Sequence, residues 1–287
     1  MNQLNLFAEL TRLKKPIGYM LLFWPCSWGL TVAYDFSSDL NVYFFYLLLF
    51  FLGAVLMRSA GCIVNDILDK EFDAKVLRTK IRPIASGKIS VILAILYVIV
   101  LCLLALFVLL NFNKLTIILA LGSMPLAFTY PLMKRFTYWP QLFLGITFNY
   151  GLILGWTAVK DQIDLIVFLF YFGAIFWTLG YDTIYGFQDI KDDEIIGLKS
   201  TSIKFKDNEK LFLFICWSFL SVSFLAGGYF MNFNYIYFLL SIIPIIHLFY
   251  YQLKFKQNEP SSCLRVFKSN NIFGLIIFIN ILISKNL

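Results

Sequence analysis

Apolar residues run through the chain in long blocks separated by short polar stretches. Nine blocks are close to the ~20 residues that an α-helix needs to cross a membrane. The predicted spans cover 16–35, 41–64, 89–110, 114–133, 138–159, 163–186, 211–230, 234–252 and 268–284. The pattern predicts an all-α polytopic bundle of about nine transmembrane helices. No polar linker divides it, so we expect one intramembrane domain over residues 1–287.

Positive charges gather on the side of the membrane that holds the N-terminus. Of the 24 Lys and Arg residues, 20 fall in segments on this side; Lys114, Lys160 and Lys285 lie opposite, and Arg58 lies within the second span. The positive-inside rule therefore predicts a cytoplasmic N-terminus and a periplasmic C-terminus. The first residues show neither a signal-peptide core nor an Arg- and Ser-rich presequence, which favours a multi-pass protein of the bacterial inner (plasma) membrane.

Composition supports a membrane protein and narrows its chemistry. Hydrophobic residues make up 60% of the chain and charged residues 14%, whereas soluble domains are about half apolar and about a quarter charged. The net charge of +7 belongs to the loops, so it indicates orientation in lipid and anionic substrates, and not nucleic acid. The five cysteines have no paired spacing and the sole histidine, His247, lies in an apolar span. Neither a disulfide framework nor a zinc cluster is expected.

The second apolar block ends in a run of carboxylates. If the helix continues through this run, Asn65, Asp66, Asp69 and Asp73 fall within an arc of about 100°. Carboxylates this close together are costly unless a cation lies between them. Oxygen ligands in this number suit Mg²⁺, which also keeps water or substrate phosphate oxygens in its shell. Together with the second acidic face described next, the pattern indicates a metal–phosphate site between the two faces.

A second acidic face follows the sixth span, where Asp182, Asp189 and Asp193 would lie within about 40° of one another on a continuing helix. Its alternative interpretation is a solvated helix end, but Asp182 falls inside the span, where an ionisable group is costly and usually functional. Tyr185 lies on the same stretch, and Asp192 beside Asp193 leaves open which of the two faces a metal. Four spans separate the two faces, so both lie on one side of the membrane and can share a cavity.

Basic residues follow the first acidic face at Arg78, Lys80 and Arg82. They form either an ordinary cytoplasmic loop or a clamp that neutralises a diphosphate held through Mg²⁺. Lys134 and Arg135 follow the fourth span. These two are either headgroup anchors or, for the planar guanidinium of Arg135, a group that recognises a carboxylate.

Two further arginines lie near the predicted site. Arg12 precedes the first span and has the same two interpretations as Arg135. Arg58 lies about two helical turns before Asn65, so it is a candidate to face the cavity and not lipid.

The two acidic stretches resemble known motifs. Asn65-Asp66-x-x-Asp69-x-x-x-Asp73 and Tyr185-x-x-x-Asp189-x-x-x-Asp193 are similar to the two aspartate-rich motifs of the intramembrane aromatic prenyltransferases, the UbiA superfamily. The segments 12–18, 57–62, 78–83, 130–135, 181–185 and 197–202 resemble one branch, the 4-hydroxybenzoate polyprenyltransferases of ubiquinone biosynthesis. The likeness runs from about residue 12 to the end, in matching order.

The resemblance implies a nine-helix bundle around a cavity that opens to the cytoplasmic leaflet. It implies Mg²⁺-dependent transfer of a polyprenyl group from polyprenyl diphosphate to 4-hydroxybenzoate, ortho to its hydroxyl. By family position, metal and diphosphate would be held by Asn65, Asp66, Asp69, Asp73, Asp189 and Asp193, of which the aspartates are the candidate catalytic residues. Arg135 would bind the aromatic acid. The other candidate substrate-binding residues are Arg12, Asn65, Arg58, Arg78, Lys80, Arg82, Lys134, Asp182 and Tyr185.

Two other functions compete with this one. The first is transfer to another aromatic or quinoid acceptor, as in menaquinone, haem O or tocopherol chemistry. The second is divalent-cation transport, which would need a conduit to the outer face, where the loops carry almost no charged partners. The sequence does not reveal the prenyl chain length, the group that accepts the ring proton or the oligomeric state.

Overall fold

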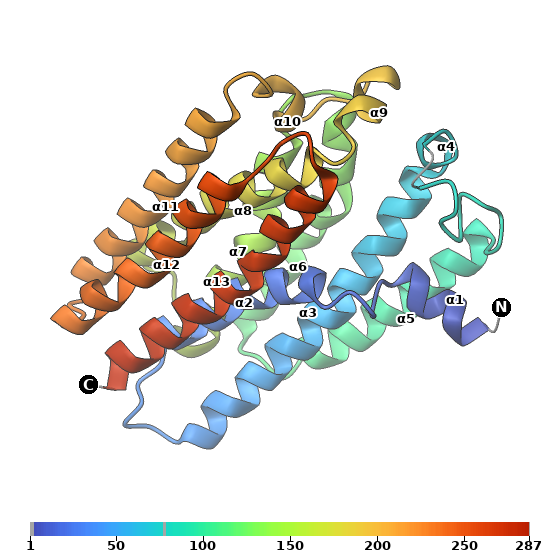
Figure 1. Cartoon of the computed structure of the whole chain (residues 1–287). Helices are drawn as coiled ribbons and strands as arrows, with labels where there is room; N and C mark the ends of the chain where they lie inside the picture. Colours follow the sequence, from blue (N-terminus) through green and yellow to red (C-terminus); the bar gives the residue numbers. More distant parts are fainter. Residues whose placement is uncertain (1–2, 77–78, 287) are drawn as a thin grey trace.

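The computed structural model describes residues 3–76 and 79–286, and this part of the chain is helical without a β-strand. Eight of its helices are long and apolar enough to cross a membrane. They are α3 (Leu40–Leu68), α5 (Val91–Leu109), α6 (Lys114–Thr129) with its 3-10 extension η1 (Tyr130–Arg135), α7 (Pro140–Lys160), α8 (Leu165–Gly186), α11 (Glu209–Phe230), α12 (Tyr235–Lys254) and α13 (Pro260–Asn286). With α2 (Ile17–Ala33), they confirm the predicted all-α membrane bundle (Figure 1).

The remaining helix, α2, lies inside the bundle and is shorter than each of the eight spans, when α6 and η1 are taken as one. Most of its 17 side chains are buried, and it packs against α3, α7 and α13. A Cβ atom at Gly29 would lie 2.0 Å from the carbonyl oxygen of Leu152, and one at Gly155 would lie 2.3 Å from that of Cys26. These two glycines therefore allow the backbones of α2 and α7 to touch.

The last helix begins earlier than the hydropathy pattern predicts. α13 starts at Pro260, eight residues before the predicted span at 268. Proline is favoured in the first turn of a helix because it lacks the amide hydrogen that would go unpaired there. The carbonyl of Glu259 accepts the amide hydrogens of Ser262 and Cys263. The first turns of α13 are polar, so hydropathy detects only the apolar part that follows.

Both acidic stretches interrupt their helices, which corrects the assumption of continuous helical faces. α3 ends at Leu68, and Asp69 (φ −95°, ψ 4°) joins it to the short helix α4 (Lys70–Asp73). α8 ends at Gly186, and Asp189 (φ −115°, ψ 6°) precedes the short helix α9 (Ile190–Ile195). Aspartate competes for backbone hydrogen bonds and opposes the dipole at a helix C-terminus, so both breaks occur where carboxylates enter the sequence.

The two acidic stretches lie at the same end of the bundle. Figure 1 shows α4, α9 and α10 (Thr201–Lys204) at one end, and the loop between α2 and α3 at the other. This is the arrangement that four intervening spans predict.

A hydrophobic cluster separate from the main core supports the end of α3. It joins Leu6 and Leu10 of α1 (Gln3–Leu10) to Ile63 of α3, and to Ile84 and Ile89 of the loop before α5. All five side chains are almost fully buried. The loop that follows the first acidic stretch is thus packed against α1 and α3.

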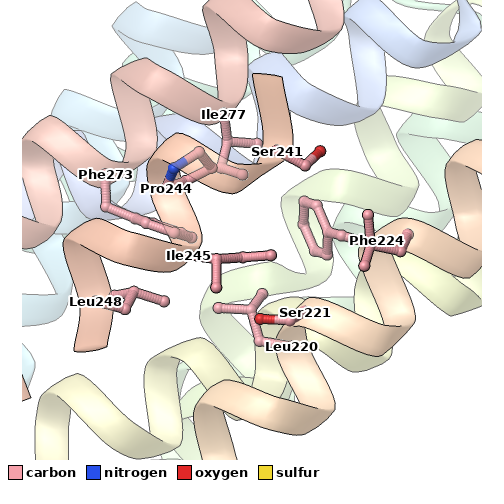
Figure 2. Close-up of a pocket in the computed structure, with 10 residues that line it drawn as sticks. Leu220, Ser221, Phe224, Ser241, Pro244, Ile245, Leu248, Phe273 and Ile277 are labelled. Atoms are coloured by element: carbon pink, nitrogen blue, oxygen red, sulfur yellow. The ribbon is translucent and has the colours of Figure 1, made fainter. Parts of the chain in front are cut away.

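A small apolar pocket lies between α11, α12 and α13 (Figure 2). Two hydroxyl groups line it, and each donates to a carbonyl of its own helix: Ser221 to Trp217 at 2.7 Å and Ser241 to Tyr237 at 2.8 Å. The rest of the lining is apolar. The pocket therefore suits hydrocarbon and offers nothing that would bind a charged group.

Candidate active site

Three aspartates at the end of α3 and in α4 form the centre of the candidate site. Asp66 and Asp69 are each 2% exposed and Asp73 is 7% exposed, whereas Asn65 is half-buried. The i to i+4 hydrogen bonds of a helix continue across the break after α3. The amide of Asp69 donates to the carbonyl of Asn65 at 2.9 Å, and the amide of Asp73 donates to the carbonyl of Asp69 at 2.8 Å. Carboxylates buried to this degree need partners of opposite charge.

Basic residues from three other segments supply those partners. Arg12 donates from Nη2 to Asp66 at 2.6 Å. Arg82 bridges two aspartates through Nη1, at 3.2 Å from Asp66 and 2.7 Å from Asp73. Lys134 forms an ion pair with Oδ2 of Asp69. The structure thus brings Arg12, Arg82 and Lys134 together around the first acidic stretch.

The carboxylates keep capacity for a divalent cation. Oδ1 of Asp69 is buried and has no hydrogen-bond partner. Burial raises the pKa of Asp73 above its ordinary value, and Arg82 opposes this only in part. A cation would give Oδ1 of Asp69 a partner and would stabilise the charged form of Asp73. Within residues 3–76 and 79–286, no group of three His, Cys, Asp or Glu side chains is placed so that it could hold a metal ion. The aspartates pair instead with basic side chains.

The second acidic stretch presents half-buried carboxylates. Asp182 on α8 and Asp189, Asp192 and Asp193 around α9 are all of intermediate exposure. The amide of Asp193 donates to the carbonyl of Asp189 at 2.9 Å. Tyr185 is also half-buried, and its ring centroid lies 4.6 Å from that of Phe267.

A buried hydrogen-bond network holds the end of α8 against α10. Ser202 donates to the carbonyl of Thr183 at 2.8 Å, and the hydroxyls of Thr183 and Thr201 are 2.6 Å apart. Oε1 of Gln141 on α7 accepts the amide of Thr201 at 3.0 Å. A Cβ at Gly186 would lie 2.3 Å from Oγ of Ser202. Glycine at the end of α8 therefore permits the close contact that positions the second stretch.

Lys134 connects the two acidic stretches. Its side chain pairs with Asp69, and its carbonyl accepts the amide of Lys199 at 2.9 Å. The neighbouring amide of Leu198 donates to the carbonyl of Asp193 at 2.9 Å. Arg12, which holds Asp66, also interacts electrostatically with Tyr185. The two stretches are therefore neighbours at one end of the bundle.

Arg135 is not one of the basic residues that form ion pairs with the buried aspartates. Its side chain is exposed, and Nη2 donates to the carbonyl of Leu68 at 2.6 Å. Its guanidinium carbon lies 5.2 Å from the centroid of the Phe72 ring. Arg135 thus caps the C-terminal end of α3, where carbonyls lack helical partners. Lys80 is exposed, and Arg78 lies outside the described residues.

Arg58 is a cation within the membrane-spanning part of α3. Nη1 donates to Sγ of Cys62 at 2.6 Å, and the guanidinium carbon lies 5.8 Å from the centroid of the Phe148 ring. Its charge interacts with Asp182 and Tyr130. Cys62 and Tyr130 lie in segments that carry the family resemblance, but the sequence predicted no role for either residue in the site. The spacing of four residues from Arg58 to Cys62 could have indicated the first contact; no local pattern indicates the second.

Comparison with known proteins defines the class. A profile of the UbiA prenyltransferase family matches residues 22–281. The chain therefore belongs to the UbiA prenyltransferase family, as the resemblance predicted.

Curated relatives are similar to this chain over nearly its whole length. The chain is 43% identical over 282 residues to "4-hydroxybenzoate polyprenyltransferase, mitochondrial" of Arabidopsis thaliana. The aligned region covers 98% of this chain and 69% of that protein. The chain is 45% identical over 284 residues to the protein of the same name from Bos taurus, covering 97% of this chain and 75% of that protein. It is 36% identical over 281 residues to "4-hydroxybenzoate octaprenyltransferase" of Hydrogenovibrio crunogenus, covering 98% of this chain and 97% of that protein.

Solved structures share the fold. The apo structure of a UbiA homologue from Aeropyrum pernix superposes with a TM-score of 0.77 at 22% identity, covering 93% of this chain and 98% of that one. A UbiA homologue from Archaeoglobus fulgidus, bound to GPP and Mg²⁺, gives a TM-score of 0.72 at 18% identity, covering 98% of this chain and 100% of that one.

Proposed function

We propose that this enzyme transfers a polyprenyl group from polyprenyl diphosphate to the ring carbon of 4-hydroxybenzoate ortho to the hydroxyl, in ubiquinone biosynthesis. The products are 3-polyprenyl-4-hydroxybenzoate and diphosphate. The names of the curated relatives support this acceptor and this donor class. The observation that carries the chemistry is the buried group of Asp66, Asp69 and Asp73 with three basic partners.

The site residues have assigned roles in this proposal. Asn65, Asp66, Asp69 and Asp73, with Asp189 and Asp193, would hold a divalent cation, which we propose to be Mg²⁺ as in the Archaeoglobus fulgidus homologue. Bound there, the cation would draw charge from the departing diphosphate.

In this proposal, Arg12, Arg82 and Lys134 neutralise diphosphate oxygens. Each now pairs with an aspartate. A cation bound to the aspartates would replace these basic groups as their counter-charge. The basic groups would then be free to pair with the diphosphate of the substrate.

The bond changes follow from the substrates. The C1–O bond of the donor breaks, and its electron pair leaves with the diphosphate. The ring carbon ortho to the phenol hydroxyl bonds to C1, and loss of its proton restores the aromatic ring. We propose that one of the aspartates orients the phenol or takes its proton.

The direct test is a prenylation assay. Membranes that contain the chain are incubated with 4-hydroxybenzoate and prenyl diphosphates of several lengths, with Mg²⁺ or with EDTA. We expect prenylated acid only with Mg²⁺, and a loss of at least about 100-fold in Asp69→Ala and Asp189→Ala membranes. Wild-type rates in both variants would contradict the proposed roles. If the enzyme preferred another aromatic acceptor when both were present, 4-hydroxybenzoate would not be its acceptor.

The membrane in which the enzyme works is a separate proposal. We propose the bacterial inner membrane, with the N-terminus in the cytoplasm and residues 1–287 acting as one domain. The distribution of Lys and Arg and the Hydrogenovibrio crunogenus relative support it. The relatives from Arabidopsis thaliana and Bos taurus are named as mitochondrial. Detection of the protein in mitochondrial fractions of its source would contradict this proposal.

A further inference from the structure

Aromatic and basic side chains form a surface beside α10, at the end of the bundle that holds the acidic stretches (Figure 1). The members of this aromatic–basic surface are Phe136, Tyr138 and Trp139, which lie between η1 and α7, with Lys199 just before α10 and Lys204 at its end. Phe136 is 70% exposed and Tyr138 is 43% exposed. Exposed aromatic side chains beside lysines are typical of the depth at which a protein meets lipid headgroups.

The two lysines of this surface have rings as neighbours and no carboxylate as a direct partner. Nζ of Lys199 lies 5.6 Å from the centroid of the Tyr138 ring, and Nζ of Lys204 lies 4.6 Å from that of Trp139. Among the described residues, neither ammonium lies within 4.0 Å of a carboxylate oxygen. An ammonium that rests on a ring keeps its charge and has hydrogens left for an anion. Both lysines can therefore bind phosphate oxygens.

The aromatic–basic surface borders lipid-facing parts of two membrane-spanning helices. Trp139 directly precedes α7, and the ring of Phe205 stacks on Phe212 of α11 with 4.0 Å between centroids. Further along these helices, Phe143 on α7 and Phe214 on α11 are exposed. Exposed apolar groups on a span contact hydrocarbon, so the starts of α7 and α11 come at the depth of the headgroups. A phospholipid thus matches the surface through its headgroup and the two helices through its chains.

Charge favours an anionic lipid over a zwitterionic one. Two carboxylates close in sequence, Glu194 and Asp207, both interact with Lys206. The positive charges of Lys199 and Lys204 are therefore left without a direct ion pair in the part of the chain that the structure describes. Basic groups at the membrane surface attract lipids that carry a net negative charge.

The same surface is joined to the connection between the two acidic stretches. The amide of Lys199 donates to the carbonyl of Lys134 at 2.9 Å, and Nζ of Lys199 donates to the carbonyl of Phe136 at 3.3 Å. Lys134 in turn pairs with Asp69. A headgroup held by Lys199 would therefore restrain the segment that carries this connection.

We infer that the aromatic–basic surface binds the headgroup of an anionic phospholipid in the leaflet at this end of the bundle, and that the bound lipid steadies the connection between the acidic stretches. The inference goes beyond the proposed function, because it depends on neither the donor nor the acceptor.

Native mass spectrometry of the purified full chain in detergent tests the binding. Wild type is titrated with phosphatidylglycerol, which is anionic, and with phosphatidylcholine, which is zwitterionic. The double variant Lys199→Gln/Lys204→Gln removes both lysines of the surface. Lys254→Gln/Lys268→Gln is the matched control: it removes the same charge from two exposed lysines elsewhere, and Nζ of Lys254 also rests on a ring, 4.3 Å from the centroid of Tyr250.

We expect the first phosphatidylglycerol to bind wild type about tenfold more tightly than the first phosphatidylcholine, since each lysine near an anionic headgroup contributes about fivefold. The Lys199/Lys204 variant should bind the two lipids about equally, and the control should keep the wild-type preference. Equal affinities in wild type, or an undiminished preference in the Lys199/Lys204 variant, would overturn the inference. So would displacement of the lipid by glycerol phosphate, which has no chains, because the ligand would then be a soluble phosphate.

Amide hydrogen exchange in nanodiscs tests the effect on the connection. In wild type, phosphatidylglycerol should slow exchange at the amide of Lys199 relative to phosphatidylcholine, because the headgroup restrains the segment that donates to Lys134. The Lys199/Lys204 variant should lose this difference between lipids, and the control should keep it. Exchange in wild type that is the same in both lipids would show that a bound lipid does not steady the connection. These measurements need no turnover, so their outcome is separate from that of the prenylation assay.

Discussion

Ion pairs at the first acidic stretch join residues that are far apart in sequence. Asp66 pairs with Arg12 and Asp69 with Lys134, across 54 and 65 positions. The residue types and their spacing predict the acidic group, because helical periodicity places aspartates three and four residues apart on one face. The partner of each aspartate is set by packing, so the sequence alone could not distinguish Lys134 from Arg135.

The pair between Lys134 and Asp69 supports a prediction on stability. Lys134→Met would leave a carboxylate that is 3% exposed without its counter-charge. We expect a loss of about 2 kcal/mol in EDTA, the range for a hydrogen bond to a charged group, because the buried carboxylate loses its partner. Excess Mg²⁺ should recover part of this loss, since the cation replaces the missing ammonium. Thermal unfolding in detergent, with and without Mg²⁺, measures both.

Lys206→Met is the matched control. Lys206 pairs with Glu194 at 2.7 Å, but their side chains are 44% and 39% exposed. Surface pairs contribute up to about 1 kcal/mol, and Mg²⁺ should not change this value. A loss in Lys134→Met no larger than in the control, or unaffected by Mg²⁺, would contradict the buried-pair account.

At the scale of the elements, the hydropathy pattern predicts the membrane-spanning helices closely. It does not predict where α3 and α8 are interrupted. Long apolar blocks predict where helices cross, because lipid requires every backbone group to be paired within the helix. α3 and α8 end where the sequence turns from apolar to polar. Side chains and water compete there for backbone hydrogen bonds, and a hydropathy pattern does not indicate the outcome. The interruptions at Asp69 and Asp189, and the early start of α13 at Pro260, therefore escaped prediction.

Contact between α2 and α7 is predicted to depend on glycine. Gly29→Ala would place a Cβ 2.0 Å from the carbonyl oxygen of Leu152, so the two helices must separate. We expect destabilisation by at least about 2 kcal/mol, in the range for an overpacked core. Gly53→Ala on α3 is the control, because its Cβ meets nothing within 4 Å and should be neutral or slightly stabilising. Equal unfolding temperatures for the two variants would refute the close packing.

For the whole molecule, the even number of crossings between the acidic stretches is the decisive feature. Four spans return the chain to the same end of the bundle, where Lys134 then links Asp69 to the segment after Asp193. Topology therefore made the meeting of the stretches predictable, whereas the contacts that join them depend on η1 and α10. The central claim is that the two stretches act as one site for a cation and a diphosphate.

Binding of Mn²⁺ in the presence of inorganic diphosphate tests this claim most directly. Mn²⁺ replaces Mg²⁺ and is detected by electron paramagnetic resonance on the purified protein. In wild type, we expect each ligand to increase the affinity for the other by tenfold or more, because both occupy one site. Asp69→Asn and Asp189→Asn should each abolish this mutual effect. If either variant keeps it at the wild-type magnitude, the two stretches act separately and the account is wrong.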